Sequence, residues 1–223
     1  APEILSGLVG SEMCIRDSNY NMIKPIVLPG NGSTCEFPGA SLRYFESFFS
    51  KKETNRYFKQ LKDEILWQQD SITVYGKKYS QPRLTALYAN NSLPYSYSGI
   101  TMHPHRITPL LFEIQNRVQS IINIEFTTVL LNLYRNGKDS NGWHADNEKE
   151  LGENPAIASV SFGAERFFHL KHKNQKELRL KIPLTSGSLL LMEGETQTHW
   201  LHQVAKTSKL VGPRINLTFR KII

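Results

Sequence analysis

Short strand-like segments follow one another through the second half of the chain, and this succession limits the possible folds more than any other feature. The seven segments cover 127–134, 156–162, 166–170, 178–182, 188–192, 200–204 and 214–220. Glycine and proline lie between many of them, as expected for turns. Seven short strands in succession are typical of a β-sandwich or a barrel. The 223 residues are enough for one sizeable hydrophobic core.

Two earlier stretches have helical character. Within 41–69, Phe58, Leu61 and Ile65 recur at helical spacing, with lysines on the other side. A second helix is expected to begin at Thr108 and Pro109, because threonine is a favoured N-cap and proline is favoured at the first helical position. Residues 72–75 and 84–88 read as strands. We expect the two helices to cover one sheet.

The N-terminal segment gives no clear pattern. Residues 11–18 resemble a translated sequencing adapter, so the native start is expected downstream of them. We therefore predict an irregular, partly artefactual tail over 1–38 and one folded domain over 39–223. Residues 1–10 lack the basic and apolar regions of a signal peptide. No apolar run reaches membrane-spanning length.

The charge balance narrows the possible partners. The net charge is +7 and the pI is about 9.4. A basic chain suggests a polyanionic partner, above all nucleic acid, or an anionic membrane surface, although a soluble surface with a modest excess of lysine fits equally well. The two cysteines are too few for a disulfide framework or a zinc cluster, which fits a reducing compartment.

A histidine and an aspartate two residues apart follow the first of the seven segments. On an extended segment, His144 and Asp146 would point to the same face and would be able to hold one divalent metal. In isolation, such a triplet is more often a surface turn. With His202 from a later strand, it makes the two-histidine, one-carboxylate set of non-heme Fe(II) oxygenases. This set leaves metal positions open for a cosubstrate and dioxygen.

The last segment alternates between polar and apolar residues. Its polar face carries Arg214, Asn216, Thr218 and Arg220, and its apolar face carries Ile215, Leu217 and Phe219. The apolar face belongs to the core. The polar face is either a solvated row or the wall of an enclosed site, where guanidinium groups would pair bidentately with a dicarboxylate.

The ordered combination of these motifs resembles the AlkB family of Fe(II)- and 2-oxoglutarate-dependent dioxygenases, which repair alkylated nucleic acids. The motifs are Asn132-x-Tyr134, His144-x-Asp146, His202 and 214–220, with twelve positions from His202 to Arg214. The likeness covers roughly residue 74 to the C-terminus, and the best match is the branch acting on double-stranded DNA. It implies an α+β, mainly β fold: a double-stranded β-helix, or jelly roll, with N-terminal helices packed on one sheet.

The resemblance also implies a role for each matching residue. The iron ligands would be His144, Asp146 and His202, which form the catalytic set together with Arg220. The residues around 2-oxoglutarate would be Asn132, Tyr134, Arg214, Asn216 and Arg220. Arg214 would pair with the distal carboxylate, whereas Arg220 and Asn216 would lie near the metal-chelating end. Iron, 2-oxoglutarate and dioxygen are therefore the expected cofactor and cosubstrates.

The substrate contacts implied by the resemblance are Tyr75, Arg83, Tyr95, Tyr97, Glu148, Lys171 and Lys173. A base must leave the duplex before it reaches the metal. Tyr95 would stack on this base, Tyr97 would shape its pocket and Tyr75 would fill the gap that it leaves. Arg83 would contact the base or backbone, and Glu148 the exocyclic amine. Lys171 and Lys173 would grip phosphates, although a solvated loop is the usual state of such lysines. Asn147 stands where the family branch often has an acid.

The expected function is oxidative demethylation of 1-methyladenine and 3-methylcytosine in DNA, which converts 2-oxoglutarate and O2 to succinate and CO2 and releases formaldehyde. Two alternatives remain: the same chemistry on RNA or protein, and a basic nucleic-acid-binding jelly roll without turnover. We expect a monomer that does not bind membranes, located in the cytoplasm, or in the nucleus if the source is eukaryotic.

Overall fold

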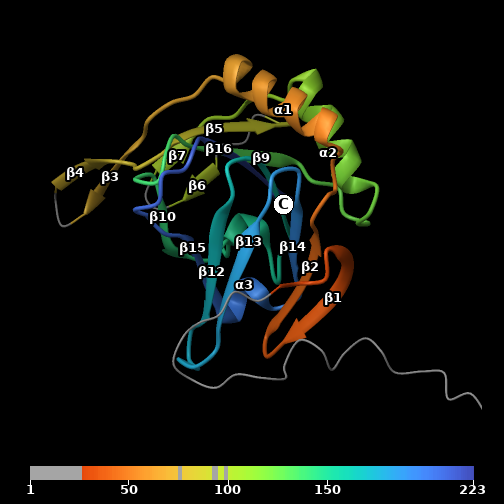
Figure 1. The fold of residues 1–223 in the computed structure, drawn as a ribbon. Helices are drawn as coiled ribbons and strands as arrows, with labels where there is room; N and C mark the ends of the chain where they lie inside the picture. Colours follow the sequence, from red (N-terminus) through yellow and green to blue (C-terminus); the bar gives the residue numbers. More distant parts are fainter. Residues whose placement is uncertain (1–26, 75–76, 92–94, 98–99) are drawn as a thin grey trace, which may run out of the picture.

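Two sheets, a large one and a small one, form the body of the protein (Figure 1). The computed structural model describes residues 27–74, 77–91, 95–97 and 100–223, and the side chains of 72–78 and 92–100 are not part of that description. Many strands that lie side by side in these sheets are distant in sequence. The expected mainly β, jelly-roll-like fold with few helices is confirmed. No helix among the described residues is long and apolar enough to cross a membrane.

The large sheet has eight strands. Their order is β1 (Asn31–Phe37), β2 (Ala40–Phe45), β14 (Leu189–Glu193), β11 (Ile157–Gly163), β16 (Arg214–Arg220), β9 (Thr128–Tyr134), β5 (Leu84–Ala89) and β8 (His105–Arg106). All its pairs are antiparallel except the parallel pair of β5 and β8. The polar positions of β16 therefore lie between β11 and β9, at the centre of the sheet.

The small sheet has four strands. Their order is β10 (Asn141–His144), β15 (Trp200–Val204), β12 (Arg166–His172) and β13 (Arg179–Leu184). Two ribbons lie outside both sheets: β3 (Ser71–Val74) with β4 (Lys77–Ser80), and β6 (Tyr95–Tyr97) with β7 (Ile100–Met102). Two further helices among the described residues are about one turn long: a 3-10 helix at Lys149–Leu151 and α3 (Thr196–His199).

Two helices cover the outer face of the large sheet, as predicted (Figure 1). In α1 (Lys51–Glu64), the Ser50 side chain accepts a hydrogen bond from the Glu53 amide and the Glu53 carboxylate accepts one from the Ser50 amide, a capping box. In α2 (Pro109–Gln119), Thr108 caps the amide of Leu111. These caps fix where each helix begins, and the buried apolar residues of each helix face the sheet.

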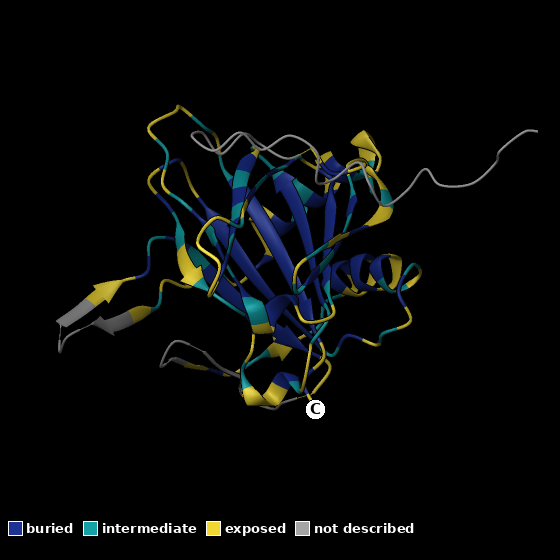
Figure 2. Cartoon of the chain, turned by 90° about the horizontal axis from the view of Figure 1, so that it is seen from below, coloured by how far each residue is buried: buried dark blue, intermediate teal, exposed yellow. Residues whose placement is uncertain are grey.

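The large sheet has a hydrophobic core on each of its two faces. One core lies under the helices and includes Leu61, Leu111 and Leu217. The other lies between the two sheets and includes Leu130, Phe168 and other residues of both sheets. Buried residues accordingly run along the central strands, while exposed residues gather on loops and hairpin ends (Figure 2).

Two predicted boundaries differ from the structure. The expectation of a helix over the whole of 41–69 is wrong, because 40–45 forms strand β2 with alternating burial and Ser50 caps the helix that follows. Residues 31–37, within the segment predicted as an irregular tail, form β1. The pair Pro38 and Gly39, with Gly39 at φ +66°, makes the tight turn between β1 and β2. The other predicted strands of the second half agree within two residues, and 200–204 and 214–220 match completely.

Candidate metal and cosubstrate site

The sheet pairing brings the predicted metal-binding side chains together. His144 ends β10 and lies opposite His202 of β15, and Asp146 follows two residues later. One ligand atom from each of these residues lies within 4.8 Å of the others. His202 Nε2 is 3.9 Å from Asp146 Oδ2, and the two imidazole rings are 4.2 Å apart between centroids. The three groups therefore fit a single metal ion.

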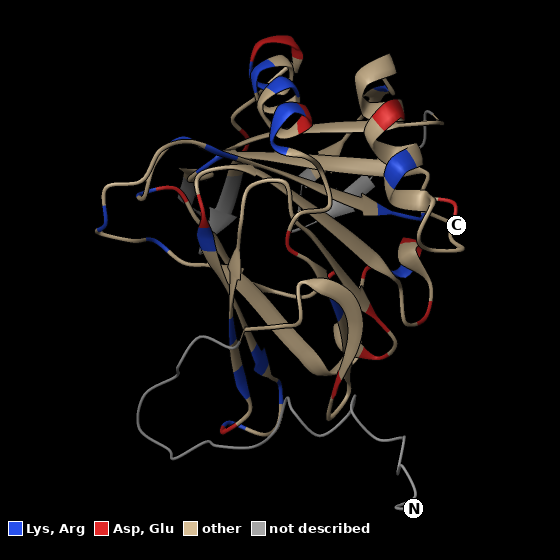
Figure 3. Cartoon of the chain, turned by 45° about the vertical axis from the view of Figure 1, so that its right-hand side comes forward, with Lys and Arg blue, Asp and Glu red and all other residues tan. Residues whose placement is uncertain are grey.

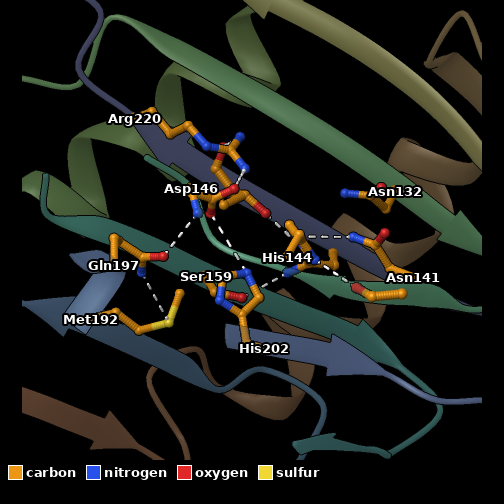
Figure 4. A network of polar contacts seen from close by, with 12 residues as sticks. Asn132, Asn141, His144, Asp146, Ser159, Met192, Gln197, His202 and Arg220 are labelled. Carbon is orange, nitrogen blue, oxygen red and sulfur yellow. Dashed lines mark hydrogen bonds and ion pairs between the residues drawn. The ribbon is translucent and has the colours of Figure 1, made fainter. Parts of the chain in front are cut away.

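Neighbouring groups orient these side chains (Figure 4). His144 Nδ1 lies 2.7 Å from the carbonyl oxygen of Gly142, so this nitrogen carries the proton. Nε2 accepts a hydrogen bond from Asn141 Nδ2 at 3.2 Å, and a metal bound at Nε2 would replace that contact. Arg220 Nη2 donates to Asp146 Oδ1 at 2.8 Å. The amide of Asp146 donates to Gln197 Oε1 at 2.9 Å. The carboxylate is thus fixed through both its side chain and its backbone.

The protonation states of the set also suit a metal. Burial lowers the pKa of His202 to about 3, with His144 adding to the effect. Burial likewise lowers the pKa of His144. Burial raises the pKa of Asp146, but Arg220 and the histidines outweigh it and bring the value to about 2. Neutral imidazoles beside an ionised carboxylate are the forms that bind divalent cations.

Arg214, the other arginine of β16 that lines the cavity, is suited to bind an anionic ligand. Arg214 is 1% exposed, and burial lowers its pKa to about 10. Its Nη2 donates to Ser161 Oγ at 2.9 Å, and its guanidinium lies 5.3 Å from the centroid of the Tyr134 ring. Its Nε and Nη1 have no hydrogen-bond partner among the described residues. A buried guanidinium with two unused donors is costly unless an anion completes it.

Amide side chains line the wall between the two arginines of β16. Asn132 and Asn216 face each other because β9 and β16 pair in that register. Asn216 Nδ2 donates to Ser159 Oγ and to the carbonyl of Val160, at 2.8 and 3.0 Å. Asn132 Oδ1 accepts from Arg83 Nε at 2.7 Å. The amide side chains of this wall are thus hydrogen-bonded to neighbouring groups of the protein.

One cavity of about 470 Å³ connects these groups. It lies between the two sheets, and its lining includes the histidine–aspartate set, both arginines of β16, and Glu148 and Trp143. A small dicarboxylate and part of a larger substrate fit this volume.

The substrate contacts expected from the sequence lie in different environments. Glu148 and Arg83 line the cavity, but Arg83 is buried and hydrogen-bonded to Asn132 and to the Ser140 carbonyl. Lys171 Nζ lies 4.4 Å from the centroid of the exposed Trp143 ring. Lys173 Nζ donates to the carbonyls of Gln197 and Thr198, so the protein already engages it.

The remaining three expected contacts are tyrosines. Tyr75 lies outside the described residues. Tyr95 and Tyr97 lie in β6, and their side chains lie outside that description.

Ser159, Ser161 and Gln197 are among the residues at the site that sequence reasoning missed. The serines alternate with Ala158 and Val160 on β11, so polar residues at inward positions of a buried strand were a usable signal. Gln197 lies in a short turn of helix and has no periodic signal. Its contact with Asp146 spans 51 positions, which only the folded chain reveals.

Comparison with known proteins assigns the chain to a family. The sequence profile of the 2OG-Fe(II) oxygenase superfamily matches residues 41–220. The chain belongs to this superfamily, and the resemblance to the AlkB family is confirmed by its relatives. It is therefore a member of a class of enzymes that use Fe(II), 2-oxoglutarate and dioxygen.

The relatives are AlkB homologues. The chain is 44% identical over 184 residues to bovine alpha-ketoglutarate-dependent dioxygenase alkB homolog 3, covering 78% of this chain and 64% of that protein. For the human homolog 3 the identity is 42% over 202 residues, with 86% and 67% covered. For the human DNA oxidative demethylase ALKBH2 it is 36% over 214 residues, with 87% and 81% covered.

A solved structure resembles the fold as a whole. The structure of OsALKBH1 superposes with a TM-score of 0.60 at 17% identity, covering 83% of this chain and 98% of that one. At this identity, the likeness concerns the fold alone.

Proposed function

We propose that this protein catalyses the oxidative demethylation of alkylated bases in DNA, with 1-methyladenine and 3-methylcytosine as substrates. The observation that carries the proposal is the meeting of His144, Asp146 and His202 in one cavity with the buried, incompletely bonded guanidinium of Arg214. This arrangement supports metal binding beside a dicarboxylate. The DNA substrate is supported by the relative named a DNA oxidative demethylase.

Each residue of the site has a proposed part in this reaction. His144, Asp146 and His202 would hold the iron. With 2-oxoglutarate and dioxygen, this metal would supply the oxidation of the N-methyl group, with succinate, CO2 and formaldehyde as products. Arg214 would bind the distal carboxylate through its unused Nε and Nη1 donors. Arg220 holds Asp146 in place and keeps it ionised.

The walls of the cavity would orient the cosubstrate. Asn132 and Asn216 present polar groups along its length, and Tyr134 packs against the Arg214 guanidinium. Because these groups are already hydrogen-bonded to the protein, binding would cost little rearrangement. Asp146 and His202 are buried and His144 is half-buried, so access of water to the oxidising centre would be restricted.

The substrate side is proposed on fewer observations. Glu148 at the cavity wall would contact the exocyclic amine of the methylated base. Tyr75, Tyr95 and Tyr97 would hold the flipped base and the gap behind it. The protein would act as a monomer and would not bind membranes. It would be located with the DNA, in the cytoplasm or, in a eukaryote, in the nucleus.

A coupled assay tests the proposal. A methylated oligonucleotide is incubated with the protein, Fe(II) and 2-oxoglutarate, and formaldehyde and succinate are measured together. We expect both products in equal amounts, and neither with Asp146→Ala. Formaldehyde formation that persists in this variant would remove the assignment.

The choice of nucleic acid has its own measurement. Methylated duplex DNA, single-stranded DNA and RNA compete in one reaction, since the relatives' names fix the DNA substrate only for ALKBH2. Preferential repair of either DNA form supports the proposal. Preferential repair of RNA favours the same chemistry on RNA.

A further inference from the structure

The outer face of the small sheet carries aromatic and positively charged side chains together, which is unusual for a surface that contacts only solvent. In β12, β13 and β15 every second residue is buried, so the alternate residues point outward. The outward residues are Phe167, His169, Lys171, Arg179, Lys181, Pro183, Leu201 and Gln203. The register aligns them in rows across the sheet, with Lys171 between Arg179 and Leu201, and His169 between Lys181 and Gln203.

The charge on this sheet has one sign. Its four strands contain Arg166, Lys171, Arg179 and Lys181 and no aspartate or glutamate. Arg166 points inward and donates to backbone carbonyls, so the other three cations belong to the outer face. The chain has 20 acidic residues, which makes their absence from these strands a local feature. Blue segments along these strands are visible in Figure 3.

Aromatic rings accompany two of the cations. Lys171 Nζ lies 4.4 Å from the Trp143 ring centroid, and Lys181 Nζ lies 4.2 Å from that of Phe167. Trp143 is nevertheless 38% exposed. Each pair offers a ring for stacking and a cation within a few ångströms of it. Nucleotides present the matching groups, a flat base next to a phosphate.

This face leads to the reaction site. Trp143 lies on β10 directly before His144, and it lines the cavity. Adjacent strands are about 4.8 Å apart, so β13 lies about 14 Å from β10 across the sheet. A cavity occupied by one base would therefore continue into a surface long enough for a few neighbouring nucleotides.

We infer that the outer face of the small sheet binds a single-stranded nucleic-acid segment flanking the base held in the cavity. Lys171, Arg179 and Lys181 contact its phosphates, and bases stack on Trp143 and Phe167. This inference rests on the proposed function, because it adds the flanking strand to the same substrate. An acidic peptide is the other ligand that a basic face would attract, but it offers the two rings nothing to stack.

Binding of an unmethylated oligonucleotide tests the inference without any turnover. Fluorescence anisotropy of a labelled oligothymidylate of about twelve nucleotides is measured at several salt concentrations, in the absence of iron. The test variant is Lys171→Gln with Lys181→Gln. The matched control is Lys59→Gln with Lys62→Gln, which removes the same charge from exposed positions on α1.

We expect the test variant to bind about tenfold more weakly, with a salt slope smaller by about 1.4, since each lost phosphate contact on a single strand removes about 0.7. The control should keep the wild-type slope. Equal losses in both variants, or none in the test variant, overturn the inference. Melting temperatures of both variants show whether each is folded.

The stacking part has a separate readout. Trp143→Ala should weaken binding at least about fivefold, and Trp143→Phe should restore most of it, because base–aromatic stacking tolerates a change of ring. Equal affinity in all three proteins rejects the stacking. If polyglutamate displaces the labelled oligonucleotide as effectively as unlabelled oligothymidylate does, the face is not specific for nucleic acid and the inference is rejected. If the protein binds the oligonucleotide through this face but does not demethylate methylated DNA, the proposed function is refuted and the nucleic-acid-binding surface alone is supported.

Discussion

Both faces of β16 are buried, but one packs in the hydrophobic core and the other lines the cavity. All seven residues from Arg214 to Arg220 are buried. Ile215, Leu217 and Phe219 pack under the helices in a continuous apolar core. The alternate residues line the cavity between the sheets. One strand thus separates stability from chemistry by the direction of its side chains, and substitutions on the two faces should fail in different ways.

The polar face is also unequal along its length. At one end, Arg220 is paired with Asp146 at 2.8 Å. At the other end, Arg214 has a serine and a tyrosine ring but two donors without a hydrogen-bond partner among the described residues. Buried charge is stable only when compensated. The charge at the paired end is therefore compensated by a carboxylate of the protein, whereas an anionic ligand would compensate the other end.

The largest effect is expected on the polar side of this comparison. Replacing His144 by alanine removes a metal ligand, so turnover should fall at least about 1000-fold, which corresponds to about 4 kcal/mol. The urea midpoint of the metal-free protein should change little, because the site contributes chemistry rather than packing. Succinate formation and urea unfolding are the two measurements. A large loss of stability with turnover retained would reverse the comparison.

The opposite pattern is expected on the helix-facing side. Leu217→Ala leaves a cavity in a fully buried core and should lower the free energy of unfolding by about 2–5 kcal/mol. Turnover per folded molecule, measured well below the melting temperature, should remain near that of the wild type. If the folded variant lost activity as His144→Ala does, the two faces would not be independent.

A smaller effect distinguishes the two ends of the polar face. Arg214→Lys keeps the positive charge but loses the planar fork, so the KM for 2-oxoglutarate should rise about 10- to 100-fold. At saturating 2-oxoglutarate, kcat should stay within a few fold of the wild type. Titration of 2-oxoglutarate gives both constants. An unchanged KM would mean that the cosubstrate binds elsewhere in the cavity.

The smallest effect concerns the helix layer alone. Ser50→Ala removes the N-cap of α1 and should cost about 1 kcal/mol of stability. Thr108→Ala, which removes the equivalent cap of α2, serves as the matched variant. Thermal melts measure both, and the KM for 2-oxoglutarate should not move in either. A change in KM would connect the helix layer to the cavity.

The alternating strands were predictable from the sequence because their pattern is local. In 214–220, polar and apolar residues alternate without interruption, and the predicted bounds equal those of β16. The spacing of His144 and Asp146 likewise placed both side chains at one site. Their function stays a prediction until a metal is bound and measured.

Features that depend on long-range pairing were not predictable. Arg83 lines the cavity and hydrogen-bonds to Asn132, a contact that follows from the pairing of β5 with β9, and its contact with the substrate stays a prediction. Lys173 donates to two carbonyls near α3, which the sequence did not indicate, and its contact with phosphates stays a prediction. The segment 41–45 fits helical spacing almost as well as strand alternation, and its pairing with β14 decides in favour of a strand.

The position of β10 has a consequence for the local stability of the site. This strand has four residues, and it lies at the edge of its sheet, with β15 as its neighbour. His202 comes from an interior strand, whereas His144 is attached to a short edge strand with one neighbour. Backbone amides of β10 should therefore exchange with solvent deuterium faster than those of β15. Cation loading should slow β10 most, because binding energy then restrains that edge.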